Sequence, residues 1–298
     1  MAYALRAVLL LLTGVHGSDC HSGYLCHGYL CFDRLFTREA KADLPTREGN
    51  NVVHPELSIA QAFKHYFDVK LAATKAQKAD VYRIRYSVYC QEFGYEPAEN
   101  FPDGLEFDEY DEHSLHCLIT HKSTGMPAGC VRMVPRSESK VLPLEQFCSE
   151  ALDNSFIESL NLDTSQMCEI SRLAVDSAFR RRSSDHKAHL REFEALDYSK
   201  RERRTFPLIA VAAFLGATAL TAAAGRTHVF AMMEPFLPRM LQRSGIFFQC
   251  AGKEIDYHGL RAPYFIRTEN ALSTMKADLK ELYELIEADV RQQYMQQA

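Results

Sequence analysis

The chain has 298 residues, of which 47% are hydrophobic and 24% charged, values that exclude a disordered protein and a polytopic membrane protein. A formal net charge of −5 excludes the basic footprint that non-specific nucleic-acid binding requires. Nine cysteines without a repeating spacing favour free thiols in a reducing compartment, so we expect a cytoplasmic protein.

Residues 1–57 are predicted to be a poorly structured N-terminal extension and linker. The apolar run after Arg6 is too short to span a bilayer and resembles the core of a signal peptide. A working signal, a surface anchor that makes a peripheral membrane contact, and a spurious extension remain as alternatives. Cysteines and histidines between residues 20 and 31 lack the paired spacing of structural zinc sites, so we expect no metal there.

The folded domain is predicted over residues 58–270. Apolar residues recur at spacings of three and four over residues 79–93, which predicts an amphipathic helix that ends at Gly94. The acidic stretch 95–113 contains prolines and a glycine and is predicted to be a mobile loop.

Strands are predicted to follow this loop. Residues 115–121 and 128–134 are separated by a short segment rich in turn residues, which predicts an antiparallel hairpin. A third strand is predicted at residues 167–175. Residues 207–224 are apolar on nearly all sides and end at Gly225, which indicates a buried helix, with a transmembrane helix as the second interpretation.

The rest of the chain alternates again between strands and helices. The predicted elements are a strand at 227–232, a helix at 235–243, and closing strands at 246–251 and 264–267. Residues 271–298 show helical spacing and are predicted to add a C-terminal helix that packs on the core or binds a partner. This order predicts an α/β (α+β layered) fold with a central mixed, mostly antiparallel sheet flanked by helices.

Four motifs carry the information about function. They are Arg85-Tyr-Ser-Val-Tyr89, Glu106-Phe-Asp108-Glu-Tyr-Asp111, Gly129-Cys-Val-Arg132 and Glu169-Ile-Ser-Arg172-Leu-Ala-Val175. Their order and spacing resemble the acyl-homoserine lactone synthase superfamily. They more closely resemble its relatives that make N-acyl amino acids, including the acyltransferases associated with PEP-CTERM and exosortase systems. The resemblance covers about residues 79–270.

The resemblance implies a GNAT-like acyltransferase fold whose sheet splays at its centre, with an acyl chain on one side of the cleft and an amine entering from the other. It also implies a charged cluster around the cleft. The cluster positions are Arg85, Tyr89, Glu106, Asp108, Asp111, Arg132, Glu169 and Arg172. Tyr95 falls where the lactone synthases carry a tryptophan, and the chain has no tryptophan, which weakens a lactone-synthase interpretation.

Aminolysis of a thioester needs a group that accepts the amine proton and a donor for the developing oxyanion. We assign catalysis to Glu169 as the leading base, to Glu106 as the second candidate, and to Arg172. Substrate binding is assigned to Arg85, Tyr89, Tyr95, Asp108, Asp111 and Arg132. A purely structural role, in which paired charges hold the acidic loop against the sheet, remains the alternative for these residues.

The spacing of Glu169 and Arg172 gives a geometric expectation. Side chains alternate along a strand, so residues three apart face opposite sides of the sheet. Both can line one cleft only if a β-bulge lies between them, and the resemblance leads us to expect such a bulge.

The acyl donor is predicted to be an acyl carrier protein. Coenzyme A enzymes of this fold hold pyrophosphate on a glycine-rich loop, and residues 179–187 contain no glycine. A basic patch would instead suit an acidic carrier. The proposed docking residues are Arg180, Arg181, Arg182 and Lys187, with a solvated insert as the alternative. We expect no tightly bound cofactor and no metal, the donor being the acyl-phosphopantetheine of the carrier.

These patterns together predict an N-acyltransferase that moves a long-chain acyl group from acyl carrier protein to the α-amine of an amino acid. One alternative is an acyl-homoserine lactone synthase that uses S-adenosylmethionine. Another is a non-catalytic binding or membrane-associated scaffold of the same fold.

Overall fold

The structure, a computed structural model, describes residues 57–180 and 200–297. Within this part of the chain eight strands form one sheet in the order β1-β2-β3-β4-β5-β8-β6, with β7 paired to β8 beside this path. The strands are β1 (Phe67–Leu71), β2 (Leu115–His121), β3 (Pro127–Pro135), β4 (Met167–Val175), β5 (His228–Met233), β6 (Gln249–Cys250), β7 (Ile255–Asp256) and β8 (Leu260–Arg267). Only β4 and β5 pair in parallel; the other pairs are antiparallel.

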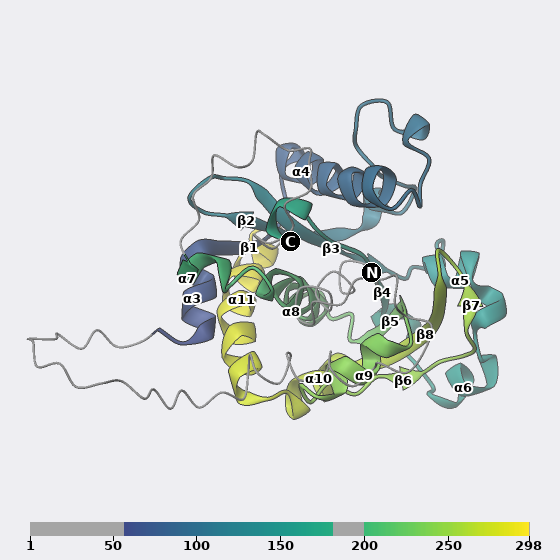
Figure 1. Ribbon diagram of the computed structural model, residues 1–298. Helices are drawn as coiled ribbons and strands as arrows, with labels where there is room; N and C mark the ends of the chain where they lie inside the picture. The colour runs from purple at the N-terminus through teal and green to yellow at the C-terminus, as the bar shows by residue number, and fades with distance from the viewer. Residues whose placement is uncertain (1–56, 181–199, 298) are drawn as a thin grey trace, which may run out of the picture.

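Helices lie on both faces of this sheet, and the mixed, mostly antiparallel layered fold predicted from the sequence is confirmed (Figure 1). The helices are α3 (Ile59–Tyr66), α4 (Lys75–Arg85), α5 (Pro143–Phe147), α6 (Asn154–Ser159), α7 (Lys200–Arg203), α8 (Leu208–Ala223), α9 (Phe236–Gln242), α10 (Thr268–Thr274) and α11 (Ala277–Met295). Helix α4 packs on β2 and β3 from one side, and α8 packs on the same strands from the other.

The first helix of the described residues starts at a cap formed by Ser58. The Ser58 side chain accepts a hydrogen bond from the Gln61 N–H, and the Gln61 side chain accepts one from the Ser58 N–H, a capping box that starts α3. Strand β1 follows at once and forms the edge of the sheet beside β2. This strand was not predicted from the sequence. The predicted segment 1–57 lies outside the described residues, apart from Leu57.

The helix predicted at residues 79–93 is present but changes its form halfway. It begins earlier, as α4, and from Tyr86 to Glu92 the backbone continues as a π-helix. It ends before Gly94, whose φ of 61° is the left-handed conformation that glycine adopts readily. A π-helical turn of this kind is frequent at functional sites, and this one carries Tyr89.

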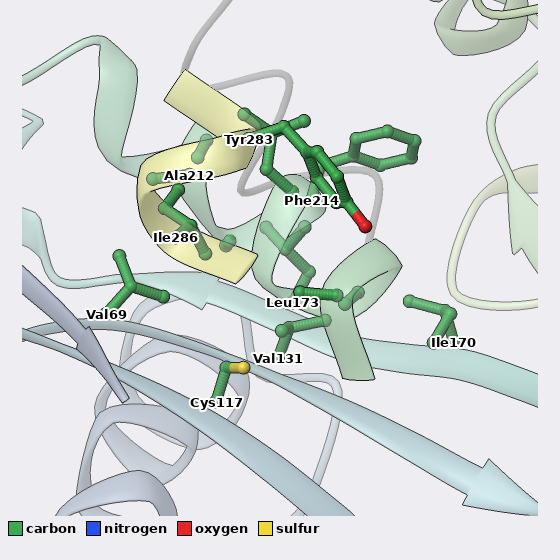
Figure 2. Close-up of a cluster of buried hydrophobic side chains, with 14 of the residues drawn as sticks. Val69, Cys117, Val131, Ile170, Leu173, Ala212, Phe214, Tyr283 and Ile286 are labelled. Atoms are coloured by element: carbon green, nitrogen blue, oxygen red, sulfur yellow. The ribbon is translucent and has the colours of Figure 1, made fainter. Parts of the chain in front are cut away.

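Helix α8 is a core helix. Nearly all of its side chains are buried, and it lies between the sheet and α11. A Cβ at Gly216 would lie 3.1 Å from the Cys117 sulfur and 3.2 Å from Val69, so glycine lets the helix approach β1 and β2 closely. Figure 2 shows Phe214 of α8 and Ile286 of α11 in this buried cluster. Among the residues that the structure describes, no helix has both the length and the apolar character to span a membrane.

The last part of the chain departs from the sequence prediction in its boundaries. The single C-terminal helix is two helices, α10 and α11, and α11 packs on α8 and β1 with Leu279, Leu282 and Ile286 in the main core. The predicted strands 227–232 and 264–267 are present as β5 and the longer β8, whereas only two residues of the predicted strand 246–251 form β6.

The sheet opens between its two central strands. Strands β4 and β5 are in register only from the pair Met167 and His228 to the pair Glu169 and Phe230. Beyond Glu169 the two strands part. At this opening the middle of β4, from Glu169 to Arg172, lines a pocket.

Candidate active site

A β-bulge in β4 shapes the site. Cys130 of β3 is opposite Ala174, but Arg132 is opposite Ser171, so β4 contains one more residue than β3 over this interval. Arg172 lies in this interval with a φ of 50°, a left-handed conformation that is uncommon for a residue other than glycine. Glu169 and Arg172 therefore line the same pocket, and the expected bulge is confirmed.

The pocket encloses about 580 Å³ of empty space, its open mouth included, and collects five of the predicted site residues. These are Tyr89, Tyr95, Arg132, Glu169 and Arg172. The four other predicted cluster residues do not line it. They are Arg85, Glu106, Asp108 and Asp111.

Glu169 is the buried carboxylate of the pocket. Glu169 is only 4% exposed, and its Oε2 accepts a hydrogen bond of 2.7 Å from the N–H of Leu144 in α5. It forms no ion pair with any described residue. Burial raises the pKa of Glu169 to about 7, against the Leu144 N–H and the nearby Arg132, which lower it. A carboxyl group with this pKa can gain and lose a proton near neutral pH, which suits a general base.

Arg85 holds the acidic loop against the sheet. Its guanidinium is fully buried, pairs through Nε with Glu106, and lies 2.6 Å through Nη1 from Asp111. Burial acts to raise the pKa of both carboxyl groups, but Arg85 and a second arginine beside each outweigh it and lower both values. The loop predicted to be mobile is thus anchored at two buried charges. Glu106, the second candidate base, is held ionised away from the pocket.

Two further arginines continue this network toward the pocket. Nη1 of Arg132 lies 2.6 Å from Asp108, and Nη2 of Arg172 lies 3.3 Å from Asp108 and 3.4 Å from Glu96. Nε of Arg172 lies 3.2 Å from Glu106. Each of these guanidinium groups therefore already has a carboxylate partner inside the protein.

Aromatic rings form one wall of the pocket around Tyr95. The Tyr95 ring stacks on Phe93 with centroids 5.6 Å apart, and it lies 6.4 Å from the Tyr89 ring and 5.1 Å from the His258 ring. The Tyr89 hydroxyl donates a 2.9 Å hydrogen bond to the Leu173 carbonyl within the bulge. Because burial raises the pKa of Tyr89 to about 12, this hydroxyl is neutral and holds the bulge in place.

Several residues of the pocket were missed in the sequence. Tyr257, His258 and Arg261 come from the hairpin of β7 and β8, and Leu144 and Cys148 come from α5 and the residue after it. None lies in one of the four motifs, so only the pairing of β8 with β5 brings the hairpin to the site. Burial raises the pKa of Cys148 to about 11, so its thiol is not a thiolate nucleophile at neutral pH.

A second, apolar pocket of about 380 Å³ adjoins the first at Ile170, which lines both. It lies between the sheet and the helices α8 and α10. Its other lining residues are Phe214, Ala217, Thr218, Thr221, Val229, Ala231, Phe248, Ile266, Thr268 and Ala271.

The predicted docking patch lies mostly outside the described residues. This holds for Arg181, Arg182 and Lys187. Arg180 is described: it is 9% exposed, pairs with Glu92, and donates from Nε to the Val175 carbonyl at 2.7 Å. Within residues 57–180 and 200–297, no group of three or more histidine, cysteine or acidic side chains could hold a metal ion.

Part of this chain is similar in sequence to known proteins. Residues 84–188 match the family described as acetyltransferase (GNAT) domain. An acyl-homoserine-lactone synthase of Vibrio anguillarum is 27% identical over 132 residues, which are 43% of this chain and 57% of that enzyme. The matched region thus spans little more than half the length of this curated relative.

Solved structures of similar proteins include TofI, in a ternary complex with an inhibitor and MTA. It is 18% identical with a TM-score of 0.49, over 71% of this chain and 99% of that one. FeeM, an N-acyl amino acid synthase from uncultured soil microbes, is 10% identical with a TM-score of 0.45, over 70% of this chain and 94% of that one. Residues 84–188 are therefore similar to a GNAT acetyltransferase domain, and they contain β2, β3 and β4 of the mostly antiparallel sheet.

Proposed function

We propose that the protein is an N-acyltransferase that moves a long-chain fatty acyl group from an acyl carrier protein to the α-amine of an amino acid. The observation that carries the proposal is Glu169. It is a buried carboxyl group with a pKa of about 7, placed where β4 and β5 part and beside a second, apolar pocket. A base of this kind suits the aminolysis of an acyl thioester, and the apolar lining of the second pocket suits contact with an alkyl chain.

In the proposed reaction the amine nitrogen attacks the thioester carbonyl, a C–N bond forms, and the C–S bond breaks. Glu169 accepts the proton that the nitrogen loses, and the departing thiolate takes up a proton and leaves as a thiol. Because the register of β4 with β5 ends at Glu169, we assign the oxyanion to backbone N–H groups of β4 beyond that residue. The acyl chain would occupy the apolar pocket past Ile170.

The carrier protein is the proposed donor because of the basic segment after Phe179. Arg181, Arg182 and Lys187 would supply the positive charge for docking, whereas Arg180 already neutralises Glu92. Coenzyme A is the competing donor. The cytoplasmic location and the association with PEP-CTERM and exosortase systems stay predictions from the sequence.

The test uses the purified full-length chain with acyl carrier protein loaded with C8 to C16 acyl groups, and in parallel with the same acyl groups on coenzyme A. Each donor is offered a mixture of amino acids, and mass spectrometry detects the amide products. We expect N-acyl amino acids, formed faster from the carrier. A faster reaction with acyl-coenzyme A would identify coenzyme A, and not the carrier protein, as the donor. The absence of an amide product from every pairing would overturn the proposal.

The second candidate is synthesis of an acyl-homoserine lactone, which the similarity to the Vibrio anguillarum enzyme favours. In that reaction S-adenosylmethionine supplies the amine, and ring closure follows acylation. Adding S-adenosylmethionine to the same assay separates the two: a lactone product would decide for this candidate. If Glu169→Gln leaves the biological activity untouched, the protein is instead a non-catalytic scaffold.

A further inference from the structure

Arg261 differs from the other arginines of the pocket. It lies on β8, lines the pocket, and is only 6% exposed. Arg132 and Arg172 each pair with a carboxylate, whereas Arg261 forms no ion pair with any residue that the structure describes. The site therefore contains one buried guanidinium whose charge the described protein does not neutralise.

The surroundings of Arg261 hold its position without neutralising it. Nη2 donates a 3.2 Å hydrogen bond to the His258 carbonyl, and Cζ lies 5.8 Å from the centre of the Tyr95 ring. His258 has a φ of 53°, which turns the β7–β8 hairpin so that its carbonyl faces the guanidinium. Nε is buried and has no hydrogen-bond partner within the described residues.

A buried guanidinium with an unused donor is a ready partner for an anion. Removing a cation from water without a counter-ion costs several kcal/mol. A negatively charged ligand therefore supplies the ion pair that the described protein does not provide. Guanidinium and carboxylate match as planar, two-point partners, which makes this pair geometrically selective. The other arginines of the pocket cannot serve equally well, because Glu106, Asp108 and Asp111 already occupy them.

We infer that Arg261 binds the α-carboxylate of the acceptor, so that the accepted amines are α-amino acids rather than simple amines. This inference rests on the proposed acyl transfer. The same pocket contains Glu169, so a bound amino acid has its carboxylate at Arg261 and its amine at the base. The Tyr95 ring, which stacks on Phe93 and lies close to the Arg261 guanidinium, would lie beside the bound acceptor.

The test compares amino acids with the amines left when their carboxylate is removed: phenylalanine with phenethylamine, and leucine with 3-methylbutylamine. We expect the full-length protein to prefer the amino acid, and Arg261→Gln to reduce this preference by about 10- to 100-fold, as loss of a charged hydrogen bond predicts. The loss should appear as a higher KM for the amino acid, with the KM for the acyl donor unchanged. Arg261→Lys should recover part of the preference.

Arg239→Gln is the matched control, because Arg239 is exposed on α9 and does not line the pocket. Arg239→Gln should prefer the amino acid over its amine as strongly as the parent protein does. Thermal unfolding checks folding: since Arg261 has no charged partner among the described residues, Arg261→Gln leaves no buried counter-charge unpaired and should unfold no earlier than the parent protein.

Two kinetic outcomes would overturn the inference. Equal losses for the amino acid and its amine would show that Arg261 does not bind the carboxylate. A higher KM for the donor alone would assign the guanidinium to a phosphate of the acyl carrier. If the parent protein acylates neither amino acid, the proposed reaction fails for these acceptors. Isothermal titration with the same compounds then tests Arg261 separately, and equal affinity of the parent protein and Arg261→Gln for phenylalanine overturns it.

Discussion

Two groups of buried charges lie in and beside the pocket, and they differ in whether they are paired. Arg85, Glu106 and Asp111 are paired with one another and lie outside the pocket lining. Glu169 and Arg261 line the pocket and have no oppositely charged partner among the described residues. Both groups are almost fully buried, so burial alone does not separate them.

The difference shows how the same residue types serve two purposes. In the paired group each charge stabilises the ionised form of its neighbour, which lowers the pKa of Glu106 and keeps the group permanently charged. In the unpaired group burial dominates, and it raises the pKa of Glu169 to about 7. Permanent charges suit a scaffold, whereas a proton acceptor and an unneutralised cation suit chemistry and binding.

The largest effect should come from breaking the paired group. Arg85→Met leaves Glu106 and Asp111 buried without their main partner, and we expect the free energy of unfolding to fall by about 3–5 kcal/mol. Urea denaturation measures it. Arg83→Met on the same helix is the control, because the side chain of Arg83 is 60% exposed and pairs only with Asp80, so about 1 kcal/mol or less is expected. Similar losses for both variants would show that the buried network does not stabilise the fold.

Removing the base should give the next largest effect, on rate rather than stability. Glu169→Gln is expected to lower kcat by about 100- to 10,000-fold, the usual contribution of a general base, with little change in KM. Glu96→Gln, in the same pocket but paired with Arg172, should lower kcat far less. Steady-state kinetics with acyl carrier protein and amino acid checks both. Equal losses of kcat in the two variants would show that Glu169 is not the general base.

The pKa of Glu169 also determines in which direction Glu169→Gln changes the stability of the protein. The folded pKa of about 7 lies above the usual value for glutamate of about 4.3, so the folded protein binds more protons than the unfolded chain between these values. Stability from this group therefore falls as pH rises through that window and stays reduced above it. At pH 8 the variant should unfold at the same or a higher denaturant concentration than the parent protein. A clearly lower midpoint would show that the ionised carboxylate stabilises the fold.

The pH dependence of the reaction follows from the same group. A base must be deprotonated to act, so kcat/KM should rise with pH, reach half its maximum near pH 7, and level off above that. Glu169→Gln should lose this limb from its residual activity. If the rise of kcat/KM with pH persists in the variant, it belongs to another group. That group is not Glu106, because its lowered pKa keeps it ionised over this range.

The sequence motifs predicted Arg85, Glu106, Asp111 and Glu169 as one charged cluster around the cleft and did not separate paired from unpaired charges. The motifs that contain Arg85, Glu106 and Glu169 mark these positions, and the spacing of Glu169 and Arg172 predicted the bulge that the register of β3 and β4 contains. The apolar character of residues 207–224 likewise predicted α8, because nearly all of its side chains are buried.

The rest depends on tertiary contacts that no local pattern encodes. Arg261 is one arginine among many until β8 pairs with β5 and brings it to the pocket. The acidic loop was predicted to be mobile from its prolines and glycine, but ion pairs with Arg85 of the preceding helix anchor it. Pairing also determines which carboxylate can act as the base. Glu106 and Glu169 are both glutamates of the motifs, and only the ion pairs of Glu106 distinguish the two.

The smallest effect should come from Asp108, which pairs with two of the arginines that line the pocket. Asp108 contacts Arg132 and Arg172, but its side chain is 28% exposed, so water competes for both contacts. Asp108→Asn keeps an acceptor oxygen, and we expect it to lower the free energy of unfolding by about 1 kcal/mol or less and kcat by less than about tenfold. Asp103→Asn, exposed in the same loop, is the control and should change neither. A stability loss as large as that of Arg85→Met would mean that solvent exposure does not weaken pairing here. A rate loss as large as that of Glu169→Gln would instead place Asp108 in the chemistry, because only a group that contacts the reacting atoms should affect kcat so strongly.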